Sequence, residues 1–156
     1  MDDAAYMRLA IAKAQEGIEQ GQTPFGACIV REGQVLACSH NEVWATHDIT
    51  AHAEIQALRT ACAKLKAVDL SGATIYCTCE PCPMCFGAIH WAKIQRIVYG
   101  AGIADAEEFG FNELPISNET LKEISGSATR IDGGLMKEEN RELFRLWSKR
   151  EDRRSY

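Results

Sequence analysis

Apolar residues in the first part of the chain recur every three or four positions, which is the spacing of one face of an α-helix. The apolar positions of this helix are Met7, Ala10, Ile11, Ala14 and Ile18. Asp2 or Asp3 can cap its start, and Gly21 is suited to ending it. The pattern therefore predicts that the chain begins with an amphipathic helix.

After this helix the pattern changes to short β-prone runs that are separated by turns and further helices. Residues 27–30 and 35–39 predict a hairpin joined by the polar turn 31–34. The remaining expected elements are strands at 73–79, 96–100 and 128–131, and helices after residue 50, over 82–92 and over 138–150. The alternation of strand and helix after the hairpin predicts parallel crossovers and a layered α/β fold.

Two connections are expected to be long and polar. Residues 40–50 form the first, in which Asp48 or Thr50 can cap the helix that follows. Residues 102–118 form the second, which carries several acids and two phenylalanines. We predict both stretches to be loops.

The length of 156 residues is enough for one domain with a substantial core, so we expect a single domain over 1–156. No apolar run reaches the length of a membrane span, and the acidic N-terminus is unlike a secretory signal. These features predict a cytoplasmic protein. Its seven cysteines are then expected to be reduced, which favours metal binding or catalysis over disulfides.

The formal net charge is −5, whereas proteins that bind nucleic acid through its phosphates usually carry a basic face. The one cationic stretch lies near the C-terminus, where two acids interrupt Lys149, Arg150, Arg153 and Arg154. We interpret this stretch as the solvated end of the last helix. The charge pattern argues against nucleic acid as a partner, and the absence of a long apolar run argues against a membrane.

The densest group of reactive side chains lies where the strand 73–79 passes into the next helix. Cys82 and Cys85 stand three positions apart there, and Pro81 and Pro83 suit a strand end and a first helical turn. Cysteines in that turn are close to the positive end of the helix dipole, which favours the thiolate. Two thiolates in this setting indicate either a metal site or a disulfide.

A second reactive pair opens the preceding helix of the same β-α-β unit and consists of His52 and Glu54. Consecutive crossover helices lie side by side, so their N-termini can face a common point. One imidazole and two thiolates, from His52, Cys82 and Cys85, make a three-ligand zinc set with an open fourth position, as in catalytic sites. Glu54 is the carboxylate left over, and it is well placed to move protons.

Other uses of these cysteines stay open at this point. Cys79 could close a structural zinc site with Cys82 and Cys85, or it could form a redox pair with Cys82. A cluster of the bacterial ferredoxin type would need a further cysteine at position 89, where the chain has Ile.

The combination of His52-Ala53-Glu54 with Pro81-Cys82-Pro83-Met84-Cys85 matches the signature of the zinc nucleobase deaminases. On these motifs the chain resembles the cytidine-deaminase-like superfamily over about residues 7–100. The resemblance implies a three-layer α/β/α sandwich with a central mixed five-stranded sheet. It also implies one Zn²⁺ per subunit and a role for Glu54 as general acid and base.

Two branches of the superfamily share these motifs, namely the bacterial tRNA adenosine deaminases and the small bacterial guanine deaminases. Three segments resemble the guanine branch: Pro24-Phe25-Gly26-Ala27, the loop 105–113, and the tail 144–156 with its Trp147 and Tyr156. In that family the tail is exchanged between subunits and closes the partner's site. The resemblance therefore implies a homodimer in which the segment 137–156 is swapped.

The resemblance also implies four substrate-binding residues. Asn41 would hold the base through its amide, and Phe25 and Tyr156 would supply apolar faces and a lid. Glu113 would read the edge of the base, although the guanine enzymes carry Asp there, and Ile49 stands where Pro is usual. A Glu carboxylate can still accept two parallel N–H bonds from guanine, but it is one methylene longer.

The expected function is zinc-dependent hydrolytic deamination of a free nucleobase, with guanine converted to xanthine and ammonia. The alternatives are adenosine-to-inosine deamination of tRNA and deamination of another aminopurine, a pyrimidine or a triazine. A non-catalytic protein with a structural zinc is a further alternative. Glu54 argues against it, because a purely structural metal has no use for a carboxylate at that position.

Overall fold

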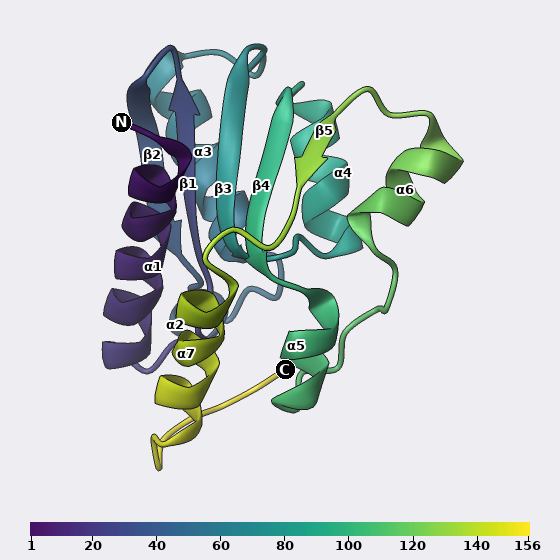
Figure 1. Ribbon diagram of the computed structural model, residues 1–156. Coiled ribbons are helices and arrows are strands. Elements are labelled where there is room, and N and C mark those ends of the chain that lie inside the picture. The colour runs from purple at the N-terminus through teal and green to yellow at the C-terminus, as the bar shows by residue number, and fades with distance from the viewer.

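The computed structural model describes residues 1–156 and contains one mixed five-stranded sheet (Figure 1). Its strands are β1 (Gly26–Arg31), β2 (Gln34–His40), β3 (Ala73–Cys79), β4 (Arg96–Ala101) and β5 (Arg130–Asp132). They lie in the order β2-β1-β3-β4-β5. β1 is antiparallel to β2 and β3, whereas β3, β4 and β5 run parallel. The mixed five-stranded sheet implied by the resemblance is confirmed.

Helices cover both faces of this sheet. They are α1 (Asp3–Glu19), α2 (Val43–Thr46), α3 (Ala53–Leu65), α4 (Pro83–Trp91), α5 (Ile103–Glu108), α6 (Asn118–Ser125) and α7 (Lys137–Ser148). In Figure 1, α1 and α7 lie on one face and α3 and α4 on the other, which confirms the three-layer arrangement. None of these helices is both long and apolar enough to cross a membrane.

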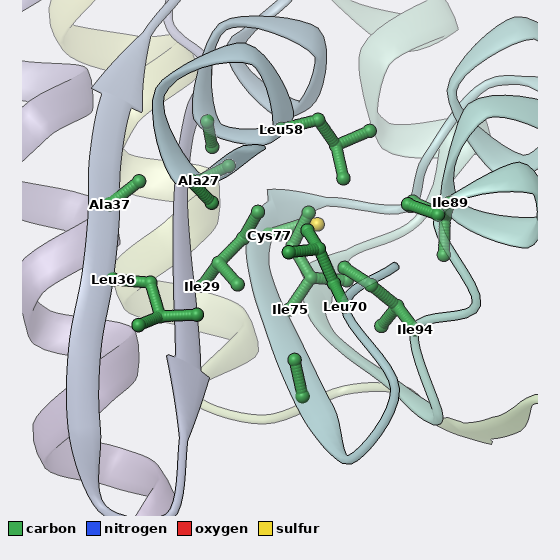
Figure 2. Close-up of a cluster of buried hydrophobic side chains, with 14 of the residues drawn as sticks. Ala27, Ile29, Leu36, Ala37, Leu58, Leu70, Ile75, Cys77, Ile89 and Ile94 are labelled. Carbon is green, nitrogen blue, oxygen red and sulfur yellow. The ribbon is translucent and has the colours of Figure 1, made fainter. Parts of the chain in front are cut away.

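The largest group of buried apolar side chains lies between the sheet and the layer formed by α3 and α4 (Figure 2). Ile29 and Ile75 of the sheet belong to this group together with Leu58 of α3 and Ile89 of α4. The face of α3 toward the sheet is largely alanine, so the helix can approach the strands closely. This packing fixes where α3 and α4 begin.

The starts of α3 and α4 lie at the same edge of the sheet. β2 and β3 are both antiparallel to β1, so they are parallel to each other and their carboxyl ends share one edge. β2 leads through α2 into α3, and β3 leads after a short connection into α4. Both α3 and α4 pack on the same face of the sheet. In α/β sheets this edge is where ligands bind.

The cap of α3 differs from the sequence-based expectation. His52 is the N-cap residue, and neither Asp48 nor Thr50 caps the helix. Asp48 instead closes a local turn, because its Oδ1 accepts hydrogen bonds from the backbone N–H and the hydroxyl of Thr50 at 2.8 and 2.7 Å. Short acidic side chains readily satisfy backbone donors two residues ahead, and here that local bond is made.

The two predicted loops were wrong in part, because each contains a short helix. Residues 40–50 include the single turn α2, and residues 102–118 include α5. Asp105 stabilises the start of α5 by accepting a hydrogen bond from the N–H of Gly102 at 2.7 Å. The helix α6 was not anticipated, although Ser117 caps it through the N–H of Thr120 at 3.1 Å. Such short helices hold too few apolar positions to show a period.

Candidate active site

The site is built from two helix starts that face each other. His52 is the N-cap residue of α3, and Cys82 is the N-cap residue of α4. Both have extended backbone, with φ −65° in each case and ψ 156° and 166°, and neither side chain makes a capping hydrogen bond. Pro83 occupies the first turn of α4, as the sequence predicted. Both side chains are therefore available for another partner.

That partner fits a metal ion. The Nδ1 atom of His52 lies 3.6 Å from the Sγ of Cys82 and 3.6 Å from the Sγ of Cys85, and all three donor atoms lie within 4.8 Å of one another. Tetrahedral zinc with bonds of about 2.3 Å to sulfur and 2.0–2.1 Å to nitrogen requires a nitrogen–sulfur separation of about 3.6 Å. The cluster can hold one zinc ion and leave the fourth position open.

The electrostatics of the cluster suit a cation. Hydrogen bonding from Cys85, together with His52, lowers the pKa of Cys82 to about 4, against the effect of burial. The hydrogen bond with Cys82, together with burial, raises the pKa of Cys85 well above its usual range. The pKa of His52 is raised; burial opposes this shift, but Cys82 and Glu54 outweigh it. Cys82 is therefore favoured as a thiolate beside His52, and a bound divalent cation would favour the thiolate of Cys85 as well.

Glu54 lies in the first turn of α3, two residues after His52, and only 8% of it is exposed. Burial raises the pKa of its carboxyl group, with the nearby Cys82 adding to the shift and His52 opposing it. Glu54 thus lies beside the cluster, and its carboxyl group holds a proton more readily there than it would in water. Such a group is suited to taking up and returning protons.

A single cavity brings together the residues that the sequence analysis proposed separately. Its walls are Phe25, Asn41, His52, Glu54, Cys79, Glu80, Cys82, Glu113 and Tyr156. All four expected substrate-binding residues lie in these walls, and Cys85 is buried beneath Cys82 as the third donor of the cluster. Cys79 lines the cavity from the end of β3. Burial raises the pKa of Glu113 to about 7.

Asn41 connects the end of β2 to the cavity. It is fully buried, and its Oδ1 accepts a hydrogen bond from the N–H of Val43 at 3.0 Å. Its Nδ2 donates to the hydroxyl of Tyr156 at 2.6 Å. The amide therefore shapes the local turn with one end and presents its donor group to the cavity with the other.

In Figure 1 the C-terminal tail, residues 149–156, runs back from the end of α7, and its last residue, Tyr156, lines the cavity. The ring of Tyr156 lies 5.5 Å from that of His52 and 6.0 Å from that of Phe111. Trp44 of α2 fastens the tail, since its Nε1 donates to the carbonyl of Arg154 at 3.2 Å and its ring lies 4.5 Å from the Arg154 Cζ. In this chain the tail covers the cavity of its own subunit.

Residues 1–101 match the family model of the cytidine and deoxycytidylate deaminase zinc-binding region. The chain belongs to this deaminase family. The match confirms the superfamily that the two motifs indicated. Together with the His/Cys/Cys cluster, it also confirms zinc as the cofactor of this deaminase.

The relatives of this deaminase include enzymes named for two different substrates. The guanine deaminase of Bacillus subtilis is 42% identical over 123 residues, which are 78% of this chain and 79% of that protein. A tRNA-specific adenosine deaminase of Agrobacterium fabrum is 45% identical over 96 residues, which are 62% of this chain and 63% of that protein. A solved guanine deaminase from Nitrosomonas europaea has a TM-score of 0.85 at 29% identity, covering 94% of this chain and 85% of that one. The family is therefore established, and the substrate is not decided by similarity.

Sequence reasoning missed two side chains that shape the site of this deaminase. Glu80 lines the cavity, and Asn118 donates from its Nδ2 to the carbonyl of Pro81 at 2.6 Å. Glu80 could have been singled out, because an acid directly before Pro81-Cys82 at the end of a buried strand needs a partner. Asn118 gives no comparable signal, since its partner lies 37 positions away.

Proposed function

We propose that this deaminase acts on a free nucleobase and converts guanine to xanthine and ammonia. The observation that carries the proposal is the position of Glu113, which lines the same cavity as Glu54 and the cluster residues His52 and Cys82. A carboxylate accepts parallel hydrogen bonds from the ring N–H and the exocyclic amine of guanine. The tail over the cavity and the net charge of −5 support a small substrate over a polyanion.

The residues of the cavity can divide the chemistry among them. A zinc ion held by His52, Cys82 and Cys85 supplies a Lewis acid that makes hydroxide available near neutral pH. Glu113 holds the base by its edge, which leaves the face of the ring free for attack. Glu54 takes a proton from water and returns protons to the ring nitrogen and the departing amine. A C–O bond forms, the C–N bond breaks, and ammonia leaves a carbonyl group behind.

Asn41, Phe25 and Tyr156 have supporting roles in this scheme. The Nδ2 of Asn41 carries two N–H groups, so it can donate one to the hydroxyl of Tyr156 and the other to an acceptor of the base. Phe25 is braced edge-on against Phe111 and Phe144, with ring centroids 5.0 and 5.7 Å away, so its ring offers a fixed apolar wall. Tyr156 closes the cavity and excludes water.

The test is ammonia release by the zinc-loaded protein from guanine, adenine, cytosine, their nucleosides and a tRNA anticodon stem-loop. We expect turnover of guanine, which Glu54→Ala abolishes without loss of zinc. Turnover of the stem-loop alone would instead assign the protein to the tRNA-specific adenosine deaminases, the substrate class of the Agrobacterium relative. Loss of zinc from Glu54→Ala would contradict the separate roles given to Glu54 and the cluster.

We also propose that two copies assemble and exchange the segment 137–156. Residues 151–155, which precede Tyr156, are exposed, so the same contacts to Trp44 and Asn41 can be made to either copy. Mixing a Glu54→Ala chain with a chain that lacks Tyr156 tests this. An exchanged tail from the first chain would restore activity to the second, whereas an unexchanged tail would leave both inactive.

A further inference from the structure

One carboxylate ties two helix starts to the end of β3. The Oε1 of Glu80 accepts a hydrogen bond from the N–H of Asn118 at 2.8 Å, and its Oε2 accepts one from the N–H of Ile103 at 3.2 Å. Ile103 is the first residue of α5, and Asn118 is the first residue of α6. N–H groups at helix starts lack partners within the helix, and a carboxylate is their preferred acceptor.

A third hydrogen bond joins the same two parts of the chain. The side chain of Asn118 is fully buried, and its Nδ2 donates to the carbonyl of Pro81 at 2.6 Å. Glu80 itself is only 9% exposed. The segment 103–118 is therefore fastened at both ends to the dipeptide Glu80-Pro81, which immediately precedes Cys82.

The fastened segment carries the carboxyl group that faces the substrate cavity. Glu113 lies between the two attachment points, and Phe111 beside it packs against Phe25 and Tyr156. The stretch between α5 and α6 has no regular structure of its own. The position of Glu113 relative to the cluster then depends on what holds the two ends of the segment.

We infer that Glu80 is a positioning residue that sets the place of Glu113 with respect to the metal centre. The inference rests on the proposed function, in which Glu113 binds the base. The role requires a carboxylate, because two N–H donors need two acceptor atoms. A glutamine would turn an NH₂ group toward one of them, and aspartate would be one methylene too short to reach both.

The test combines zinc content, hydrogen exchange and a double-mutant cycle. In Glu80→Gln we expect full zinc content and faster amide exchange confined to residues 103–118. The control is Glu119→Gln, which removes an exposed acid from the first turn of α6. Unchanged amide exchange in Glu80→Gln would overturn the inference, because Glu80 would then not hold the segment 103–118 in place. Loss of zinc would also overturn it, because Glu80 would then support the metal site directly.

The kinetic part of the test measures kcat and KM for guanine. Glu80→Gln should raise KM about ten-fold while changing kcat less, because a lost hydrogen bond to a charged group weakens the placement of a binding residue. The variant that combines Glu80→Gln with Glu113→Gln should be no worse than Glu113→Gln alone. Additive losses would contradict the inference, since Glu80 would then act independently of Glu113.

A second variant guards against misfolding of Glu80→Gln. Asn118→Ser removes the hydrogen bond to Pro81 but keeps the backbone N–H that donates to Glu80. We expect a smaller increase in amide exchange, again confined to residues 103–118. Combined with Glu113→Gln, it should again add no further loss of activity. If the protein turns over no base at all, the proposed function fails, and the exchange result still decides whether Glu80 holds the segment.

Discussion

Glu113 differs by one methylene from the aspartate that the guanine deaminases carry at this place, and it is the residue that tests the substrate. We expect Glu113→Gln to lose guanine activity by about 30-fold, because its amide NH₂ would face an N–H of the base in place of an acceptor. Activity on other bases should change little. Ammonia release from the base panel measures both, with the exposed Glu107→Gln as control. Full guanine activity in this variant would show that Glu113 does not bind the base.

Asp3 joins the start of α1 to the sheet through a bidentate pair with Arg96, at 3.0 and 2.8 Å, and through the hydroxyl of Tyr76 at 2.6 Å. The hydrogen bonds from Arg96 hold the pKa of Asp3 below its usual value. A carboxyl group with a lowered pKa in the folded state stabilises the fold above its unfolded pKa, near 4, and this contribution disappears as the pH falls through the folded value.

Asp3→Asn should therefore lower the free energy of unfolding at pH 6 by about 1 kcal/mol, since the pair is partly exposed. The difference from the unmodified protein should shrink as the pH falls below about 4. Urea denaturation of both proteins at pH 6 and at successively lower pH measures it. Glu19→Gln, at the far end of the same helix, is the control. A difference that persists at low pH would show that packing, not charge, dominates.

At the scale of residues, the sequence predicted the metal-binding and catalytic side chains better than the hydrogen bonds that position the surrounding segments. The residues of each motif are at most three positions apart, so their spacing in the sequence predicts their spacing in the fold. One motif holds His52 and Glu54, and the other holds Cys82 and Cys85. The link between Asn118 and Pro81 depends on the path of the intervening chain, which no local pattern records.

At the scale of elements, the crossing of α1 over β1 depends on the absence of a side chain at Gly26. A Cβ there would meet the backbone carbonyl of Ala10 and the backbone nitrogen of Ala14, neither of which can rotate away. We expect Gly26→Ala to lower stability by about 3 kcal/mol, and the melting temperature by roughly 6–12 °C. Calorimetry measures the change.

Gly87 provides the matched control within α4. A Cβ there meets nothing within 4 Å, and alanine is a better helix former than glycine, so Gly87→Ala should leave stability unchanged or slightly raise it. Equal melting temperatures for the two variants would mean that α1 moves away from β1 at little cost.

Long elements could be predicted from the sequence because they repeat their apolar period several times, as α1 and the strands do. The short helices α5 and α6 could not, since their starts are decided by a few hydrogen bonds to the side chains of Asp105, Ser117 and Glu80. The cap of α3 was missed for a similar reason, because Asp48 is used within its own turn.

For the whole molecule, the metal joins two helices of one layer. His52 belongs to the start of α3, whereas Cys82 and Cys85 belong to the start of α4. Removing zinc with a chelator should lower the melting temperature by roughly 10 °C, as expected for a ligand that binds only the folded state at about a thousand times its Kd. Added zinc should restore it. A Cys85→Ser variant should respond much less to the chelator, and an equal response would place the stabilising metal elsewhere.

Because His52 and Cys82 are N-cap residues whose side chains make no capping bond, a bound ion adds a link between the starts of α3 and α4 to the apolar packing that already holds these helices on the sheet. The stability that a bound ion contributes rises with the logarithm of its free concentration. A chain made during zinc shortage is then open to proteases more often than one made in plenty. Supply of the ion consequently governs how long each molecule persists, as well as whether it can react.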